Sequence, residues 1–149
     1  MNLFRRMSIL LILISMTIPS ICVAKDNQSY TATGTWSWTG PKGSGGYLLT
    51  FQKNNRVQFQ LELQRGEPSY NSGFIEGEFK LQGNKGSFRT DEFGSCEISF
   101  EIRKNEIVLT QPTNKTDCGF GYGVYPEGTY KCSSHKKPKF SSGDPRASK

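Results

Sequence analysis

Apolar and polar side chains alternate with a period of two along much of this chain. Between Val57 and Leu63 every second residue is apolar, and the residues between them are Gln or Glu. The segments 74–81 and 96–103 repeat the alternation. This pattern is typical of strands that bury one face and expose the other, as in antiparallel sheets. A helix of the same residues would place polar groups on all of its sides, so we expect strands.

Turn-forming residues separate these segments at short intervals, as in Lys53-Asn54-Asn55. Such connections fit hairpins and leave no room for crossover helices. An antiparallel meander of about eight short strands closes most economically into a barrel, because closure removes exposed edges; a two-sheet β-sandwich is the alternative. The expected strands are Thr33–Thr39, Tyr47–Gln52, Arg56–Gln64, Phe74–Leu81, Gly86–Thr90, Cys96–Arg103, Glu106–Gln111 and Gly128–Cys132.

The first 24 residues have the pattern of a secretory signal peptide. Arg5 and Arg6 precede an apolar run that ends at Ile18, and Cys22-Val23-Ala24 supplies a cleavage site before Lys25. The run is too short to cross a bilayer comfortably, which takes about 20 apolar residues. We therefore predict a cleaved segment 1–24, a mature chain without a transmembrane segment, and export to the periplasm or the medium.

The mature chain has the length of one domain. Removing Arg5 and Arg6 with the leader lowers the formal net charge from +6 to +4, and all of that excess lies in residues 133–149. The polar composition of this segment is typical of a flexible extension. We expect a neutral barrel domain over residues 25–132 and a flexible basic tail, which either contacts an anionic surface weakly or is simply solvated.

Three cysteines remain in the mature chain, and exported cysteines are more often bridged than free. A Cys96–Cys118 disulfide would close a loop of about 22 residues and stabilise by ~3 kcal/mol. Cys118–Cys132 is the alternative; we favour the first because Cys132 ends the predicted barrel, where fraying would strain a bridge. The third cysteine has no assigned role. The wide spacing lacks the close ligand pairs of structural zinc sites, so no metal or other cofactor is expected.

Catalytic chemistry has little support in this sequence. The single histidine, His135, lies in the predicted tail, which excludes a histidine-based triad within the barrel. Glu76 and Glu78 share a strand face about 7 Å apart, a separation compatible with a glycosidase pair. That face also carries Lys80 and has no sign of a cleft, so we interpret it as solvated and the protein as a non-enzyme. Export and a neutral body also argue against nucleic-acid binding.

The segment 118–126 has glycine at alternate positions, with aromatic residues between them. Phe120, Tyr122 and Tyr125 are candidate protein-binding residues, because aromatic anchors on a loop braced by Cys118 suit an interface. The alternative is a glycine-kinked barrel corner whose aromatic side chains cap the core.

The sequence Gly34-Thr35-Trp36 resembles the Gly-x-Trp that opens lipocalin and avidin-type barrels. The resemblance implies a small β-barrel in which the tryptophan plugs one end. Trp36 and Trp38 share a strand face and are either core residues or the lining of a ligand cavity, together with Tyr47, Phe51 and Phe59. Biotin binding is not implied, because further tryptophans of the avidin pattern are missing.

A second resemblance covers roughly the last third of the domain. The stretch that starts at Cys96-Glu97-Ile98-Ser99-Phe100 and continues through Asp117-Cys118-Gly119-Phe120-Gly121 to Gly128-Thr129-Tyr130 is similar to short exported bacterial proteins of unassigned function. It implies no catalytic residues.

These observations predict an exported, non-catalytic binding protein of the cell envelope, whose partner is an unknown envelope or extracellular protein. By analogy with other compact, disulfide-stapled β-domains, the partner is a hydrolase or a toxin that the protein inhibits. The neutral body argues against a basic lysozyme as the target. The second hypothesis is a lipocalin-like carrier of a small apolar ligand. The third is an envelope anchoring protein that uses the basic tail.

Overall fold

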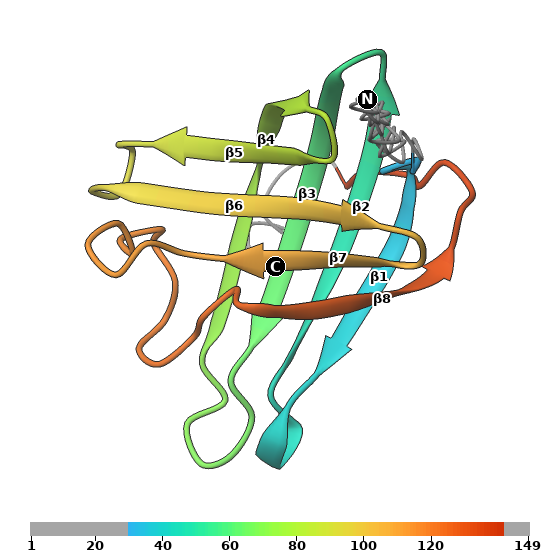
Figure 1. Ribbon diagram of the computed structural model, residues 1–149. Coiled ribbons are helices and arrows are strands. Elements are labelled where there is room, and N and C mark those ends of the chain that lie inside the picture. Colours follow the sequence, from blue (N-terminus) through green and yellow to red (C-terminus); the bar gives the residue numbers. More distant parts are fainter. Residues whose placement is uncertain (1–29, 142–149) are drawn as a thin grey trace, which may run out of the picture.

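Eight antiparallel strands follow one another around a closed barrel in the computed structural model, which describes residues 30–141 (Figure 1). The predicted fold class is confirmed, and the observed strand bounds differ from the expected ones by at most two residues. The predicted leader, residues 1–24, lies outside the described residues. The strands are β1 (Gly34–Thr39), β2 (Gly45–Lys53), β3 (Arg56–Gln64), β4 (Ser72–Gln82), β5 (Lys85–Thr90), β6 (Cys96–Arg103), β7 (Glu106–Thr110) and β8 (Gly128–Ser134), with a short 3₁₀ helix η1 (Pro41–Gly43) between β1 and β2.

Tight turns set the register of the sheet. The β2–β3, β4–β5 and β6–β7 hairpins each have two residues between the last paired positions, for example Lys53↔Arg56. Since side chains alternate along a strand, this register turns the apolar residues of β3, β4 and β6 inward together.

Aromatic rings fill the inside of the barrel. The rings of Phe79 and Phe100 stack with their centroids 4.2 Å apart, and Phe59 lies 5.0 Å from both Phe88 and Phe100. These contacts join β3, β4, β5 and β6 across the interior. The middle of the barrel is therefore a packed core.

Trp36 is fully buried towards one end of the barrel, which we call the Trp36 end. Its indole N–H donates a 2.7 Å hydrogen bond to Thr50 Oγ1. A Cβ at Gly34 would collide with the carbonyl oxygen of Ser134, so glycine allows β1 to approach β8 closely there. Trp38 is half-buried and packs against Tyr130 with the ring centroids 6.3 Å apart. Both tryptophans therefore contribute to the core.

The expected inward orientation of Tyr47 and Phe51 is wrong. Leu48 and Thr50 are the fully buried residues of β2, so the odd-numbered residues of this strand face outward. Tyr47 is 47% exposed, and Phe51 lies beneath the ammonium group of Lys137 at 4.1 Å on the outside of the barrel. Of the three aromatic residues named with the tryptophans, only Phe59 faces the interior.

The pairing of the barrel wall is weakest between β4 and β5. These strands pair only at Leu81↔Gly86 and Gln82↔Lys85, and β5 to β7 cross β1 to β4 steeply (Figure 1). The side chain of Phe120, from the loop between β7 and β8, fills space next to Gly73 of β4, where a Cβ would come within 2.5 Å of its ring. This loop therefore completes the wall.

The predicted tail is partly ordered, and its expected start at residue 133 falls within β8, which ends at Ser134. Residues 135–141, which we call the strap, continue across the outer faces of β2 and β3. The side-chain amide of Gln60 donates a 2.6 Å hydrogen bond to the carbonyl oxygen of Ser141 and accepts a 3.0 Å bond from its N–H. Specific pairing with β3 thus replaces the expected flexibility as far as Ser141; the rest of the predicted tail, 142–149, lies outside the described residues.

Within residues 30–141, no helix has the length and apolar character that crossing a membrane requires.

Candidate functional site

Three connections meet at the end of the barrel opposite Trp36, which we call the loop end. They are the β1–β2 connection with η1, the β3–β4 loop (residues 65–71) and the β7–β8 loop (residues 111–127). The first two lie side by side at the bottom of Figure 1, where the N–H of Glu67 donates to the carbonyl oxygen of Lys42 at 3.0 Å. Segments distant in sequence therefore form one continuous surface.

Exposed tyrosines gather on this surface. Among residues 30–141, five large hydrophobic side chains are exposed, and four of them are tyrosines at or near the loop end. Tyr122 is the most exposed, at 84%. Tyrosine is enriched at protein–protein interfaces because its ring supplies apolar contact area and its hydroxyl supplies a hydrogen bond. The four are Tyr47, Tyr70, Tyr122 and Tyr125.

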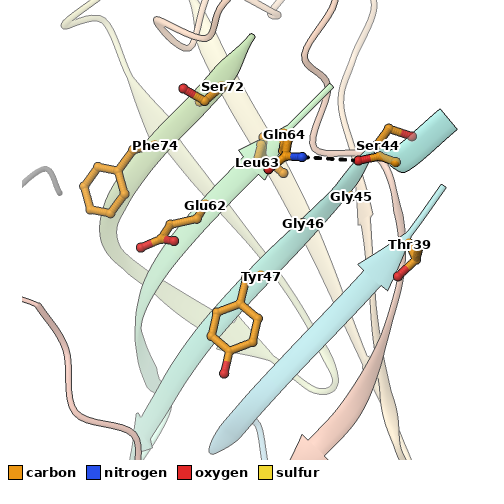
Figure 2. A pocket seen from close by; sticks show the side chains of 12 residues that line it. Thr39, Ser44, Gly45, Gly46, Tyr47, Glu62, Leu63, Gln64, Ser72 and Phe74 are labelled. Carbon is orange, nitrogen blue, oxygen red and sulfur yellow. Dashed lines mark hydrogen bonds between the residues drawn. The ribbon is translucent and has the colours of Figure 1, made fainter. Parts of the chain in front are cut away.

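An outer pocket of about 420 Å³ opens on the β2, β3 and β4 faces next to the loop end. Tyr47, Glu62 and Phe74 are direct cross-strand neighbours, so their side chains form one row along its wall (Figure 2). Glu62 is the one charged residue in its lining. The pocket therefore offers a carboxylate between two aromatic rings.

A second depression of about 640 Å³, the end pocket, lies among the loops themselves. Trp38, Arg65 and Tyr125 belong to its walls. Ser44 and Gln64 line both pockets, so the two depressions adjoin. Together with the exposed tyrosines they give the loop end a hollowed surface rich in aromatic residues.

Contacts to neighbouring segments hold the β7–β8 loop in place at Tyr122. Its carbonyl oxygen accepts hydrogen bonds from Asn71 Nδ2 at 2.8 Å and from Arg65 Nη1 at 3.2 Å. The guanidinium of Arg65 also lies 5.5 Å from the centre of the Tyr122 ring, within cation–π range. Gly123 has a φ of 73°, and a Cβ there would collide with the Arg65 guanidinium, so glycine is required for this contact.

The loop is also tied to the core. The predicted Cys96–Cys118 disulfide is present, and the sulfurs are 2.00 Å apart. The hydroxyl of the buried Tyr130 donates a 3.0 Å hydrogen bond to the carbonyl oxygen of Pro126. Burial raises the pKa of Tyr130, which keeps this hydroxyl a hydrogen-bond donor. The loop is therefore fixed to the core at Cys118 and at Pro126.

The three aromatic residues predicted for this loop divide into two groups. Phe120 is half-buried and packs against the core, whereas Tyr122 and Tyr125 point to solvent. Phe120 therefore fits the core-capping interpretation, and the interface interpretation stays a prediction for the exposed Tyr122 and Tyr125. Sequence reasoning missed Tyr70 and Arg65, because their proximity to this loop depends on how the barrel closes, and it considered Tyr47 only for the interior of the barrel.

An ion cluster around the buried Glu97 supports the β7–β8 loop. Glu97 is 6% exposed and accepts hydrogen bonds from Arg89 Nη2 at 3.0 Å and from Lys115 Nζ at 2.9 Å. Arg89 first, and then Lys115, lower the pKa of Glu97 to about 2, against the opposing effect of desolvation. Because Lys115 belongs to the β7–β8 loop, this cluster ties the loop to β5 and β6.

Glu76 and Glu78 lie on the outer face of β4, away from the tyrosines. Glu78 forms an exposed ion pair with Arg56, and Glu76 accepts a 2.6 Å hydrogen bond from Gln60. A shallow depression of about 550 Å³ passes both carboxylates and includes Phe140 of the strap. Each carboxylate is thus engaged by a neighbouring side chain.

Comparison with protein-family models, with curated protein sequences and with solved structures gave no match. The closed, eight-stranded antiparallel barrel is the architecture that the Gly34-Thr35-Trp36 resemblance implies. This agreement concerns architecture and carries no ligand or activity with it.

Proposed function

We propose that this chain is an exported, non-catalytic binding protein of the cell envelope and that it binds a partner protein through the loop end. The observation that carries the proposal is the gathering of exposed tyrosines on braced loops. Exposed apolar groups that cluster on one surface mark interaction sites, and bracing lowers the entropic cost of binding.

The charges at the loop end favour a basic partner. Glu62, Glu67 and Glu127 outnumber Lys42 and Arg65 around the two pockets. The strap carries three exposed lysines, and one of them, Lys137, lies over Phe51 on the outside of the barrel. An acidic loop end and a basic strap would orient a basic partner towards the tyrosines. A hydrolase or toxin of the envelope, inhibited by occupation of its active site, is the partner class that we propose.

Export is supported by the pattern of residues 1–24 and by the disulfide. Disulfides persist in oxidising compartments outside the cytoplasm. A compact barrel that a disulfide staples suits a protein exposed to proteases and to changing conditions.

The carrier hypothesis has less support from the geometry. Trp36, Phe59 and Phe100 are fully or almost fully buried within the barrel, which is where a lipocalin-like ligand would lie. An apolar ligand would have to use the end pocket, which Trp38 lines. This pocket opens towards solvent.

The test begins with a native mass spectrum of the mature protein, purified gently from its own compartment. We expect a stoichiometric complex with a second protein; additional mass of a few hundred daltons would instead support the carrier. The double variant Tyr122→Ala/Tyr125→Ala should lose the partner without a change in melting temperature. Lys53→Ala, at the β2–β3 turn, is the control and should keep it. Retention of the partner by the double variant would contradict the proposed surface.

A further inference from the structure

Three atoms that can bind a metal converge at the Trp36 end, where the last residues of β8 pass the β6–β7 turn. Cys132 Sγ lies 3.4 Å from His135 Nε2, and the same nitrogen lies 3.3 Å from Asn105 Oδ1. A 2.9 Å hydrogen bond from the backbone N–H of Cys132 to the carbonyl oxygen of Asn105 fixes the two segments relative to each other. The site belongs to neither the loop end nor the proposed function.

One ring nitrogen, His135 Nε2, serves both contacts. A neutral imidazole nitrogen carries either one proton or one accepting lone pair. A protonated Nε2 would divide its single hydrogen between Asn105 Oδ1 and the Cys132 sulfur, and an unprotonated Nε2 would accept the thiol proton and have none to donate to Asn105. A cation placed among the three atoms would bind a thiolate, an imidazole and an amide oxygen at once.

The two separations from Nε2 agree with tetrahedral coordination. Zinc binds cysteine sulfur at about 2.3 Å, histidine nitrogen at about 2.0–2.1 Å and carboxylate oxygen at about 2.0–2.2 Å, and we assign the amide oxygen of Asn105 the same bond length. Tetrahedral angles between such bonds place sulfur and nitrogen about 3.5 Å apart, and nitrogen and oxygen about 3.4 Å apart. The observed separations are 3.4 Å and 3.3 Å. We propose that Cys132, His135 and Asn105 form a Zn²⁺ site.

The same residue types also occur in cysteine-nucleophile triads, but the geometry here differs. In a triad one ring nitrogen meets the nucleophile while the other meets the orienting group. Here both contacts end on Nε2. A shared nitrogen suits a common ligand between the residues and prevents the relay that a nucleophile needs.

The surroundings leave room for a fourth ligand. His135 and Asn105 are exposed, and the His135 ring meets the buried Trp36 edge-on with the centroids 5.7 Å apart. Water can therefore complete the tetrahedron from the solvent side. Bound zinc would fasten the first residue of the strap to the β6–β7 turn.

The spacing Cys132-x-x-His135 is the signal that the cysteine-only argument missed. Among residues 30–141, no group of three or more His, Cys, Asp or Glu is placed to hold a metal, so the third donor here is the amide of Asn105. The chain has one histidine, and the other two cysteines of the predicted mature chain form the disulfide. A metal bound through sulfur and imidazole therefore has one possible location.

Cobalt(II) tests the proposal, because cobalt bound to a thiolate gives a charge-transfer band in the near ultraviolet and zinc displaces it. The mature protein, with its disulfide intact and one thiol counted, should bind one Co²⁺ with this band. Cys132→Ser should abolish the band, and His135→Gln should weaken Co²⁺ binding at least tenfold. Asn105→Ala should weaken it, whereas Asn105→Asp should strengthen it. Ser133→Ala, next to the site, is the control.

Absence of the band in protein with a free thiol would overturn the proposal. Unchanged Co²⁺ affinity in folded His135→Gln would also overturn it, since the site would then be a lone thiol. Protein that emerges from its compartment without a free thiol would exclude the site in the exported form. Melting temperatures of all variants establish that each comparison concerns folded protein.

Discussion

The two ends of the barrel are closed in different ways. At the Trp36 end a buried indole fills the interior, and no part of that ring reaches solvent. At the loop end Trp38 is only half-buried, and the tyrosines beyond it point outward. Both ends contain aromatic residues of similar size, so composition does not distinguish them; burial does.

The difference in burial between the two ends separates the residues that the fold needs from the residues that it does not need. Trp36 has a hydrogen-bond partner and complete burial, so packing accounts for it. Tyr122 is 84% exposed, yet its backbone is held by Arg65 and Asn71. The fold therefore does not need the Tyr122 ring, which is why we place this residue in the proposed binding surface.

The largest contrast is expected between Trp36 and Tyr122. Trp36→Ala removes a fully buried ring and the hydrogen bond to Thr50, and such truncations cost about 3–5 kcal/mol. Tyr122→Ala should change the free energy of unfolding by less than about 0.5 kcal/mol. Urea denaturation measures both. Comparable losses in the two variants would contradict the division between a structural end and a binding end.

Removal of the disulfide should affect the loop end more than the Trp36 end. The bridge spans 22 residues, so Cys96→Ser/Cys118→Ser should lower the free energy of unfolding by ~3 kcal/mol. Limited proteolysis should then cut the β7–β8 loop first. The tryptophan fluorescence that reports on the buried Trp36 should stay native until global unfolding. Cys132→Ser without added metal is the control. If the loop became cleavable and the Trp36 fluorescence changed at the same denaturant concentration, the two ends would not be independent.

A smaller effect is expected at the contact that joins the loop to the core. Tyr130→Phe keeps the buried ring but leaves the carbonyl oxygen of Pro126 without its donor. The lost hydrogen bond should cost about 1 kcal/mol. Hydrogen exchange should show faster exchange in the β7–β8 loop and unchanged rates in β2 and β3. Uniform acceleration across the barrel would contradict a local role for this hydroxyl.

Alternation was sufficient to predict most of the fold. The strands Arg56–Gln64 and Cys96–Arg103 have the predicted bounds, because each presents one apolar and one polar face. Alternation did not identify the inward face of β2, because both faces of this strand carry apolar residues. Phe51 faces outward and is covered by Lys137 of the strap, a pairing that the local pattern does not encode.

The strap and the loop end show the same limitation. Polarity predicted a flexible tail from residue 133, but residues up to Ser141 pack on the barrel through contacts to distant strands, including those of Ser141 with Gln60 and of Lys137 with Phe51. Tyr122 and Tyr125 could be predicted because glycines mark their loop. Tyr70 could not, since its proximity to them follows from barrel closure.

The smallest effect is expected from the ion cluster behind the loop, and it should depend on pH. The pKa of Glu97 falls from its ordinary value of 4.5 to about 2 in the folded protein, because Arg89 and Lys115 favour its ionised form. Its contribution to stability is therefore complete above pH 4.5 and is lost as the pH falls through about 2. The side chain of Arg89 is 69% exposed, so solvent screens its part of the cluster.

Glu97→Gln should consequently be less stable than the wild type at neutral pH, and the difference should shrink between pH 4.5 and about 2, where protonation makes the two side chains alike. Urea denaturation across this range measures the change. Glu92→Gln, an exposed carboxylate in the neighbouring loop, is the control for removing a negative charge. A difference that stays constant down to pH 2 would mean that Glu97 stabilises the loop support through its shape and not through its charge.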